Sequence, residues 1–302
     1  MFSLLTRRIG HGYHANMVTR KHEIAKDQLL YLYTEYGTIA AVARALECSP
    51  KVVSAAMKRY DLDYERVPRK YAINHHFFYT DNECEAQFYW AGFLAANANV
   101  TRTSAGESAY RIELNTGFRD LPFLDKMVRA LGSDVPVKEV WVKLRGQPYQ
   151  QARVVLNSKY MIQDLQRFNV VPKKKHSYAM PECLLRHKMV RHFLRGWVDG
   201  TGNFYTRDDL REFRTRGTIH FLEQFRNVLN ENLDLRKKDA SIVQVNRYSG
   251  MLRYGMHDDV MKIAHFLYDG ATHLMERKKD AALFGIMDSD IDAEELRDGG
   301  YA

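Results

Sequence analysis

The stretch FLRGWVDGTGNF, residues 193–204, combines an apolar run with two glycines four positions apart and leads into a strand-like segment. A related stretch, FYWAGFLAANANV, occupies residues 88–100. Residues four apart lie on one face of an α-helix, so each stretch predicts a helix with a stripe of very small side chains. Two such stripes let helix backbones approach closely, and we predict that the helices pack against each other. The stripes consist of Gly92, Ala96, Gly196 and Gly200.

If the helices pack in this way, Asn97 and Thr201 emerge side by side at the helix ends, at a seam between two halves of the chain. Plain helix packing, with nothing chemical at the ends, would use the same spacing. The segments that follow each helix support two halves, because hairpin, helix, hairpin and helix patterns recur in the same order. We therefore predict an α+β fold of two tandem αββαββα units.

A small all-α domain is predicted ahead of the two halves. Helical periodicity over residues 21–37 is followed by two short helical segments within residues 38–62, with a turn between them and Pro50 at the first position of the second. Two short helices joined by a tight turn form a helix-turn-helix, although a plain three-helix bundle has the same spacing. In a helix-turn-helix the second helix enters the major groove. Its outward residues would include Lys51, Ser54 and Lys58.

The composition favours an intracellular protein with a polyanionic partner. The formal charge is +8, but the tail from Ile286 to Ala302 has six acids and one arginine, so the rest of the chain is at +13. Nucleic acid is the default partner of such a charge, although a solvated basic surface would have the same composition. No long apolar run predicts a membrane span. The three cysteines suggest neither disulfides nor a zinc site. The basic N-terminus leaves import into an organelle, or a start at Met17, open.

These patterns divide the chain into predicted segments. They are a basic, disordered arm (1–19), a helix-turn-helix (20–64), a linker (65–83), a first repeat (84–170), an inter-repeat linker (171–181), a second repeat (182–285) and an acidic tail (286–302).

The segments WAGFLAANA (90–98) and LRGWVDGTG (194–202) resemble the paired motifs of the LAGLIDADG homing endonucleases, in the single-chain form with two fused repeats. Supporting similarities are SKYMIQDLQRFNVVPKKKH, GTIHFLEQF and FLYDGATHLMERK. With the helix-turn-helix, the arrangement is similar to phage and mobile-element members of that family, over about residues 20–285. The resemblance implies a saddle of two four-stranded sheets lying along double-stranded DNA, formed by a monomer with internal pseudo-two-fold symmetry.

The family's catalytic chemistry depends on an acid at the eighth position of each motif, which binds a divalent metal such as Mg²⁺. The eighth positions here are Asn97 and Thr201, and Ala95 and Ala98 also depart from the first motif. An amide or a hydroxyl offers only a neutral oxygen, whereas Mg²⁺ prefers carboxylates beside a phosphate. The helical position of Asp199, two residues before Thr201, predicts that its side chain points away from the seam. No metal ligand is therefore predicted.

Strand alternation and charge predict the residues that would contact DNA. In the hairpin over residues 137–157, with a turn at 146–148, we expect Glu139, Trp141, Lys143 and Arg145 to share a face with Gln151 and Arg153. Each of these residues could instead lie on a solvated strand face. Arginine and glutamine suit base edges, and lysines between the repeats suit phosphates. The further candidates are Arg111, Asn115, Lys173, Lys174, Lys175, Gln244, Asn246 and Arg253.

The sequence thus predicts a sequence-selective protein that binds double-stranded DNA on a LAGLIDADG scaffold, with cleavage lost or weakened. An active Mg²⁺-dependent homing endonuclease is the first alternative. The second is an intron maturase or another RNA-binding protein on the same scaffold. The predicted location is the cytoplasm or nucleoid of a bacterial or phage-infected cell.

Overall fold

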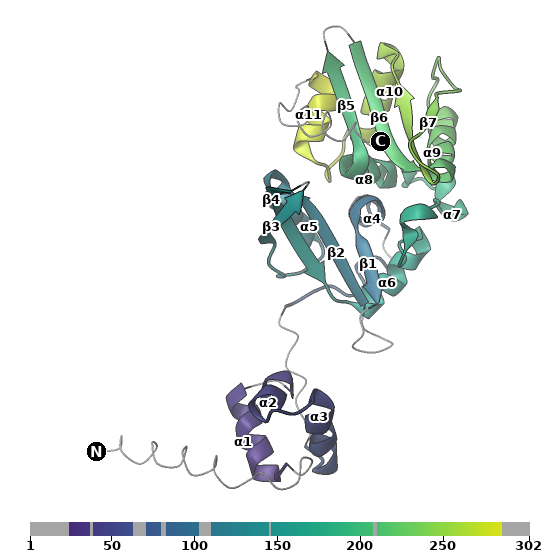
Figure 1. Ribbon diagram of the computed structural model, residues 1–302. Helices are drawn as coiled ribbons and strands as arrows, with labels where there is room; N and C mark the ends of the chain where they lie inside the picture. The colour runs from purple at the N-terminus through teal and green to yellow at the C-terminus, as the bar shows by residue number, and fades with distance from the viewer. Residues whose placement is uncertain are drawn as a thin grey trace. The chain divides into compact units, whose positions relative to one another are not determined.

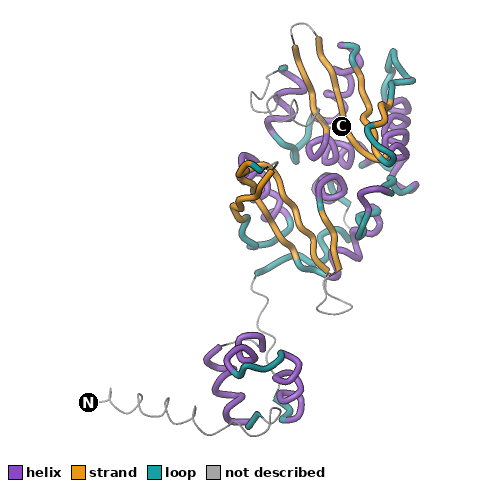
Figure 2. Tube along the Cα trace, viewed as in Figure 1, coloured by secondary structure: helices purple, strands orange, loops and turns teal. Residues whose placement is uncertain are grey.

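The computed structural model describes residues 24–36, 39–62, 71–79, 83–102, 110–144, 146–207 and 210–285. The chain forms two compact units, divided after Lys70. Figures 1 and 2 show helices alone in the first unit and a mixture of helices and strands in the second. No helix within the described ranges combines the length and apolar character needed to cross a membrane.

The first unit is built from three helices around a small apolar core. The helices are α1 (Lys26–Tyr36), α2 (Ile39–Ala45) and α3 (Pro50–Arg59). Leu29, Val42 and Val53, one from each helix, are fully buried and hold the bundle together. Lys51 and Lys58 lie on the exposed face of α3, and Ser54 is half-buried. The three helices match the predicted spacing, and groove binding by α3 stays a prediction.

The second unit contains two repeats, each with one four-stranded antiparallel sheet. The first repeat contains α4 (Glu85–Asn97), β1 (Asn99–Arg102), β2 (Tyr110–Gly117), α5 (Leu121–Ala130), β3 (Lys138–Leu144), β4 (Gln147–Leu156) and α6 (Lys159–Leu165). The second contains α7 (Glu182–Leu185), α8 (Val190–Thr201), β5 (Gly202–Arg207), β6 (Leu210–Thr218), α9 (Ile219–Asn232), β7 (Ile242–Gln244), β8 (Ser249–Tyr254), α10 (His257–Tyr268) and α11 (Glu276–Phe284). The strand orders, β1-β2-β4-β3 and β5-β6-β8-β7, are the same. This confirms the predicted tandem αββαββα fold.

One face of each sheet is buried against helices, and a single apolar core runs through both repeats. Ile112 and Leu114 on β2, and Phe213 on β6, belong to the buried faces. Figure 1 shows α4 and α8 side by side between the two sheets. Since strand residues alternate between faces, the opposite face of each sheet is left for polar side chains.

Residues 71–79, which fall within the predicted linker over residues 65–83, belong to the second unit. Phe78 is fully buried in the core of the second unit, and the side chain of Gln87 on α4 donates hydrogen bonds to the carbonyls of Phe77 and Tyr79. Aromatic residues dominate the HHFFY run at residues 75–79, and that composition was the signal for packing.

Candidate nucleic-acid interface

The seam between the repeats is formed by α4 and α8, which contact each other through their backbones. A β-carbon at Gly92 would lie 2.9 Å from the carbonyl carbon of Phe193, and one at Gly196 would lie 2.8 Å from the amide nitrogen of Phe93. A β-carbon at Gly200 would lie 2.8 Å from that of Ala96. All four residues of the predicted small-residue stripe therefore lie between the two helices.

Asn97 and Thr201 end α4 and α8 and stand at the same edge of this seam. The amide of Asn97 packs against Gly200 of the opposite helix, and its Nδ2 is buried with no hydrogen-bond partner among the residues that the structure describes. The hydroxyl of Thr201 lies 3.2 Å from the carbonyl oxygen of Trp197 and 3.3 Å from that of Arg216. Both side chains are uncharged, so the edge of the seam carries no carboxylate from either position.

Asp199, the acid retained in the second motif, was predicted to point away from the seam, but its side chain reaches across it to Tyr89 on α4. Its carboxylate accepts hydrogen bonds of 2.6 Å from the hydroxyls of Tyr89 and Tyr268, and one of 2.8 Å from the amide of Met275. The side chain is fully buried, and this burial raises the pKa of the carboxyl despite the three hydrogen bonds. All of these partners are structural, so Asp199 is committed to holding the repeats together.

The residues at the seam do not fit the divalent metal that the two motifs imply. Asn97 and Thr201 supply one neutral oxygen each, and Asp199 is turned into the core. Across the described ranges, no group of three or more His, Cys, Asp or Glu side chains is placed to hold a metal ion. Mg²⁺ is a hard cation that is usually bound through carboxylates, which this edge lacks.

The outer face of the first sheet carries three of the predicted DNA-contacting residues, on the neighbouring strands β2 and β4. On β2, Arg111 and Asn115 alternate with the buried Ile112 and Leu114. Arg153 on β4 pairs directly with Asn115, and its Nε donates a 2.7 Å hydrogen bond to the Asn115 Oδ1. The structure therefore brings these three residues together on the face that the helices leave uncovered.

The pairing of β3 with β4 contradicts the predicted grouping of Lys143 with Gln151 and Arg153. Lys143 pairs with Pro148, whereas Gln151 pairs with Val140 and Arg153 with Lys138. Directly paired residues share a face, so Lys143 and the exposed Trp141 lie on the face that carries the buried Ala152. The predicted partner Arg145 lies outside the described residues.

The cause of this error is a shift of three residues in the hairpin register, because a loop at 146–148 would pair Lys143 with Gln151 and the structure pairs it with Pro148. Leu144 pairs with Gln147, which leaves two residues in the loop instead of the predicted three at 146–148. Side chains alternate with a period of two, so a shift by an odd number of residues moves every side chain of a strand to the other face.

On the second sheet, only one of the three predicted residues occupies the outer face. Arg253 pairs with Arg214 there. Gln244 pairs with the buried Gly250 and so lies on the helix side of the sheet, contrary to the prediction. Asn246 stabilises the β7–β8 turn, because its Oδ1 accepts hydrogen bonds from the amides of Tyr248 and Ser249.

The three lysines between the repeats differ in their exposure. Lys173 and Lys175 are exposed and remain available for phosphates. Lys174 is buried, and burial lowers the pKa of its ammonium group to about 8. A buried lysine is poorly placed to contact a DNA backbone, so Lys174 is the weakest of the three candidates.

Ion pairs across the repeats also hold the seam, and the sequence patterns did not reveal them. Arg195 on α8 is fully buried and donates a 2.5 Å hydrogen bond to Glu85 on α4. Arg277 on α11 makes two 3.0 Å hydrogen bonds to the carboxylate of Asp120 in the first repeat. These contacts join residues more than a hundred positions apart, which leaves no local periodicity by which to find them.

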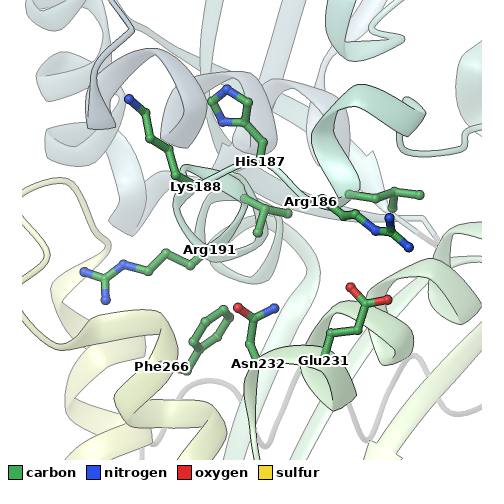
Figure 3. Close-up of a pocket in the computed structure, with 9 residues that line it drawn as sticks. Arg186, His187, Lys188, Arg191, Glu231, Asn232 and Phe266 are labelled. Atoms are coloured by element: carbon green, nitrogen blue, oxygen red, sulfur yellow. The ribbon is translucent and has the colours of Figure 1, made fainter.

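A pocket of about 320 Å³ lies next to the start of α8 and is lined in part by Arg186, Lys188, Arg191 and Glu231. Figure 3 shows the three basic side chains pointing in different directions. Arg191 also donates a 2.9 Å hydrogen bond to the carbonyl of Asp269. Because the charges do not converge, this pocket is a poorer nucleic-acid site than the outer faces of the sheets.

Two four-stranded sheets joined through paired motif helices define the fold of the LAGLIDADG homing endonucleases, which the two motifs predicted. Among solved structures, the homing endonuclease I-WcaI bound to its DNA recognition sequence is similar with a TM-score of 0.52 and 12% identity, over 69% of this chain and 90% of that one. I-DmoI in complex with DNA and Ca has a TM-score of 0.43 and 16% identity, over 70% and 99%. No family model matches the chain, and no curated protein does.

Proposed function

We propose that this chain is a sequence-selective double-stranded DNA-binding protein that keeps the LAGLIDADG fold without its cleavage chemistry. The observation that carries this proposal is the pair at the end of the seam. Asn97 and Thr201 occupy the eighth motif positions, and neither supplies a carboxylate. The backbone contacts that align the two helices are intact beside them. The packing of α4 against α8 is thus retained, whereas the negative charge at positions 97 and 201 is absent.

The DNA-binding part of the proposal is supported by charge and by position. Arg111 and Arg153 on the first sheet, and Arg214 and Arg253 on the second, lie on the faces that the helices leave open. Such arginines can contact both phosphates and base edges. The solved I-WcaI structure, which has the same fold, is bound to its DNA recognition sequence. We assign the same kind of partner to this chain, with the exposed face of α3 as a second contact.

The absence of cutting follows from the electrostatics of phosphodiester hydrolysis. A divalent metal ion bound at the phosphates of the two DNA strands stabilises the attacking hydroxide and the leaving oxygen. The protein must offset the positive charge of that metal ion. Asn97 and Thr201 supply no negative charge for this purpose. The carboxylate of Asp199 accepts three hydrogen bonds in the core, so reorienting it toward DNA would break all three.

The test begins with selection of bound duplexes from a random library by the purified full chain. A supercoiled plasmid that carries the selected site is then incubated with the protein and Mg²⁺ or Mn²⁺. We expect a specific footprint and no linear or nicked product above the background without protein. Metal-dependent cutting at the site, abolished by Asn97→Ala or Thr201→Ala, would show an active endonuclease instead. Preferential binding of structured RNA over every selected duplex would show an RNA-binding protein.

A further inference from the structure

The outer face of each sheet carries a single glutamate between two arginines. On the first sheet, the Glu113 carboxylate lies 3.0 Å from Arg111 NH2 and 3.3 Å from Arg153 Nε. On the second sheet, Glu212 lies 2.5 Å from both Arg214 NH2 and Arg253 Nε. We refer to these two sets of three residues as the Arg–Glu–Arg triads.

Arg153 and Arg253 each contact a glutamate of the neighbouring strand. Arg153 reaches from β4 to Glu113 on β2, and Arg253 reaches from β8 to Glu212 on β6. In both cases the contact uses Nε, the nitrogen nearest the backbone. Nε is fixed, so both terminal nitrogens at the far end of each guanidinium group can bind a further partner. The Nε of Arg153 donates its hydrogen bond, of 2.7 Å, to the Oδ1 of Asn115, and its contact with Glu113 at 3.3 Å is an ion pair.

A carboxylate at this place is unfavourable for plain phosphate binding. It reduces the net charge of each triad from +2 to +1, and it repels the DNA backbone. Burial would raise the pKa of Glu212, but hydrogen bonds from Arg214 and Arg253 outweigh it and lower the pKa, so the side chain is ionised at neutral pH. Each glutamate therefore weakens the general attraction to DNA. Its contribution is to orient the neighbouring arginine side chain, which matters for contacts with bases.

We infer that Arg153 and Arg253 each read a guanine in the major groove, and that Glu113 and Glu212 are the positioning residues. This inference rests on the proposed function. A guanidinium group offers donors only, and guanine is the base whose major-groove edge presents two acceptors, O6 and N7. Adenine presents one acceptor and one donor there, and cytosine presents a donor. Thymine presents one acceptor, O4, so only guanine offers an acceptor to each of the two terminal nitrogens of a fixed arginine.

The closing experiment compares bound sequences and affinities for the full chain and four variants. Arg153→Lys and Arg253→Lys keep the charge but remove the two-pronged geometry. Glu212→Gln keeps an acceptor but removes the negative charge. Arg216→Lys is the matched control, because Arg216 lies on the same face of β6 with no carboxylate partner in the described part of the chain. Affinities are also measured with 7-deazaguanine, which lacks the N7 acceptor, at each selected guanine.

We expect the full chain to select a guanine in each half of its site. Each lysine variant at position 153 or 253 loses that preference in one half only, by roughly 5- to 150-fold, which is the discrimination of one bidentate contact. A 7-deazaguanine at the same position weakens binding by the full chain and has little effect on the matching lysine variant. Arg216→Lys leaves base preference unchanged.

Glu212→Gln separates positioning from mere structural support. We expect this variant to bind random duplex as well as or better than the full chain, because a negative charge is removed, and to lose guanine preference in one half. A variant that was only misfolded would lose both its binding to random duplex and its guanine preference. Specific binding without any guanine that responds to Arg153 or Arg253 overturns the inference and leaves the proposed function standing. Absence of any duplex binding overturns both.

Discussion

Gly196 on α8 lies so close to Phe93 on α4 that a β-carbon at position 196 would stand 2.8 Å from the Phe93 amide nitrogen. The contact is between backbones, so neither side can move aside by a change of rotamer. In an ordinary helix interior, replacing glycine by alanine is favourable by up to about 1 kcal/mol. At the seam the same substitution is unfavourable, because the added methyl group would overlap the backbone of α4.

We therefore predict that Gly196→Ala lowers the free energy of unfolding by about 2 kcal/mol or more, as expected for overpacking against rigid neighbours. Urea denaturation of the full chain measures the change. Gly255→Ala is the control, because nothing lies within 4 Å of a β-carbon there and the loss should stay below about 0.5 kcal/mol. Equal effects of the two substitutions would contradict the close approach of α4 and α8.

A gain of function is expected when the two missing carboxylates are supplied. Asn97→Asp is nearly isosteric, and Thr201→Asp places a second acid at the end of the opposite helix. Two adjacent carboxylates can hold Mg²⁺ beside a phosphate. We predict Mg²⁺-dependent nicking or cutting of plasmid at the selected site by the double variant. Asn97→Ala with Thr201→Ala serves as the control and should bind the site without cutting it.

Binding to DNA is predicted to weaken steeply with salt. Apart from its acidic tail, the chain carries a formal charge of +13, and phosphate contacts release counterions. For about six to ten such contacts, affinity falls roughly 10³- to 10⁵-fold between about 50 and 200 mM salt. Fluorescence anisotropy with the selected duplex gives the slope. A nearly flat dependence would mean that few phosphates are contacted.

The first unit is predicted to add a separate contact with DNA. Lys51 and Lys58 are exposed on α3, opposite the buried Val53 and Met57. Replacing both lysines by alanine should shorten the footprint at one end and weaken binding, while protection of the central site persists. Lys26→Ala, an exposed lysine on α1, is the control and should leave the footprint intact. An unchanged footprint in the double variant would exclude α3 from the DNA interface.

Acid is predicted to destabilise the second unit through His192. Burial and the nearby Arg195 lower the pKa of His192 to about 4, and its Nδ1 lies 3.0 Å from Arg195 NH2. Between pH 4 and 6.5 the unfolded chain therefore binds more protons than the folded chain, and stability rises with pH over that window. Between about pH 6.5 and 5 the loss is on the order of 1–2 kcal/mol.

His192→Gln tests this account, because glutamine can still accept a hydrogen bond from Arg195 but does not titrate. The free energy of unfolding, measured for both proteins from pH 7 to pH 5, should fall less in the variant. Parallel pH profiles would show that His192 is not the titrating group.

The sequence predicted the elements of this fold well because their signals are local. Gly92 and Gly196 marked the seam through a four-residue spacing, and alternation marked the strands. The predicted face for Lys143 was wrong because the face depends on the length of the β3–β4 loop, which the alternation of residues does not specify. The Arg–Glu–Arg triads lie beyond local reasoning as well, since Glu113 and Arg153 become neighbours only through the β2–β4 register.

The pairing of α4 with α8 also has a consequence for synthesis of the chain. α4 is complete at Asn97, but the helix that covers its apolar surface ends at Thr201, about a hundred residues later. At roughly 5–20 residues per second, a nascent chain leaves that surface without its partner for about 5–20 s. The link from Asp120 to Arg277 closes later still. If translation pauses between the two motifs, the apolar surface of α4 stays exposed on the nascent chain, where chaperones can bind it.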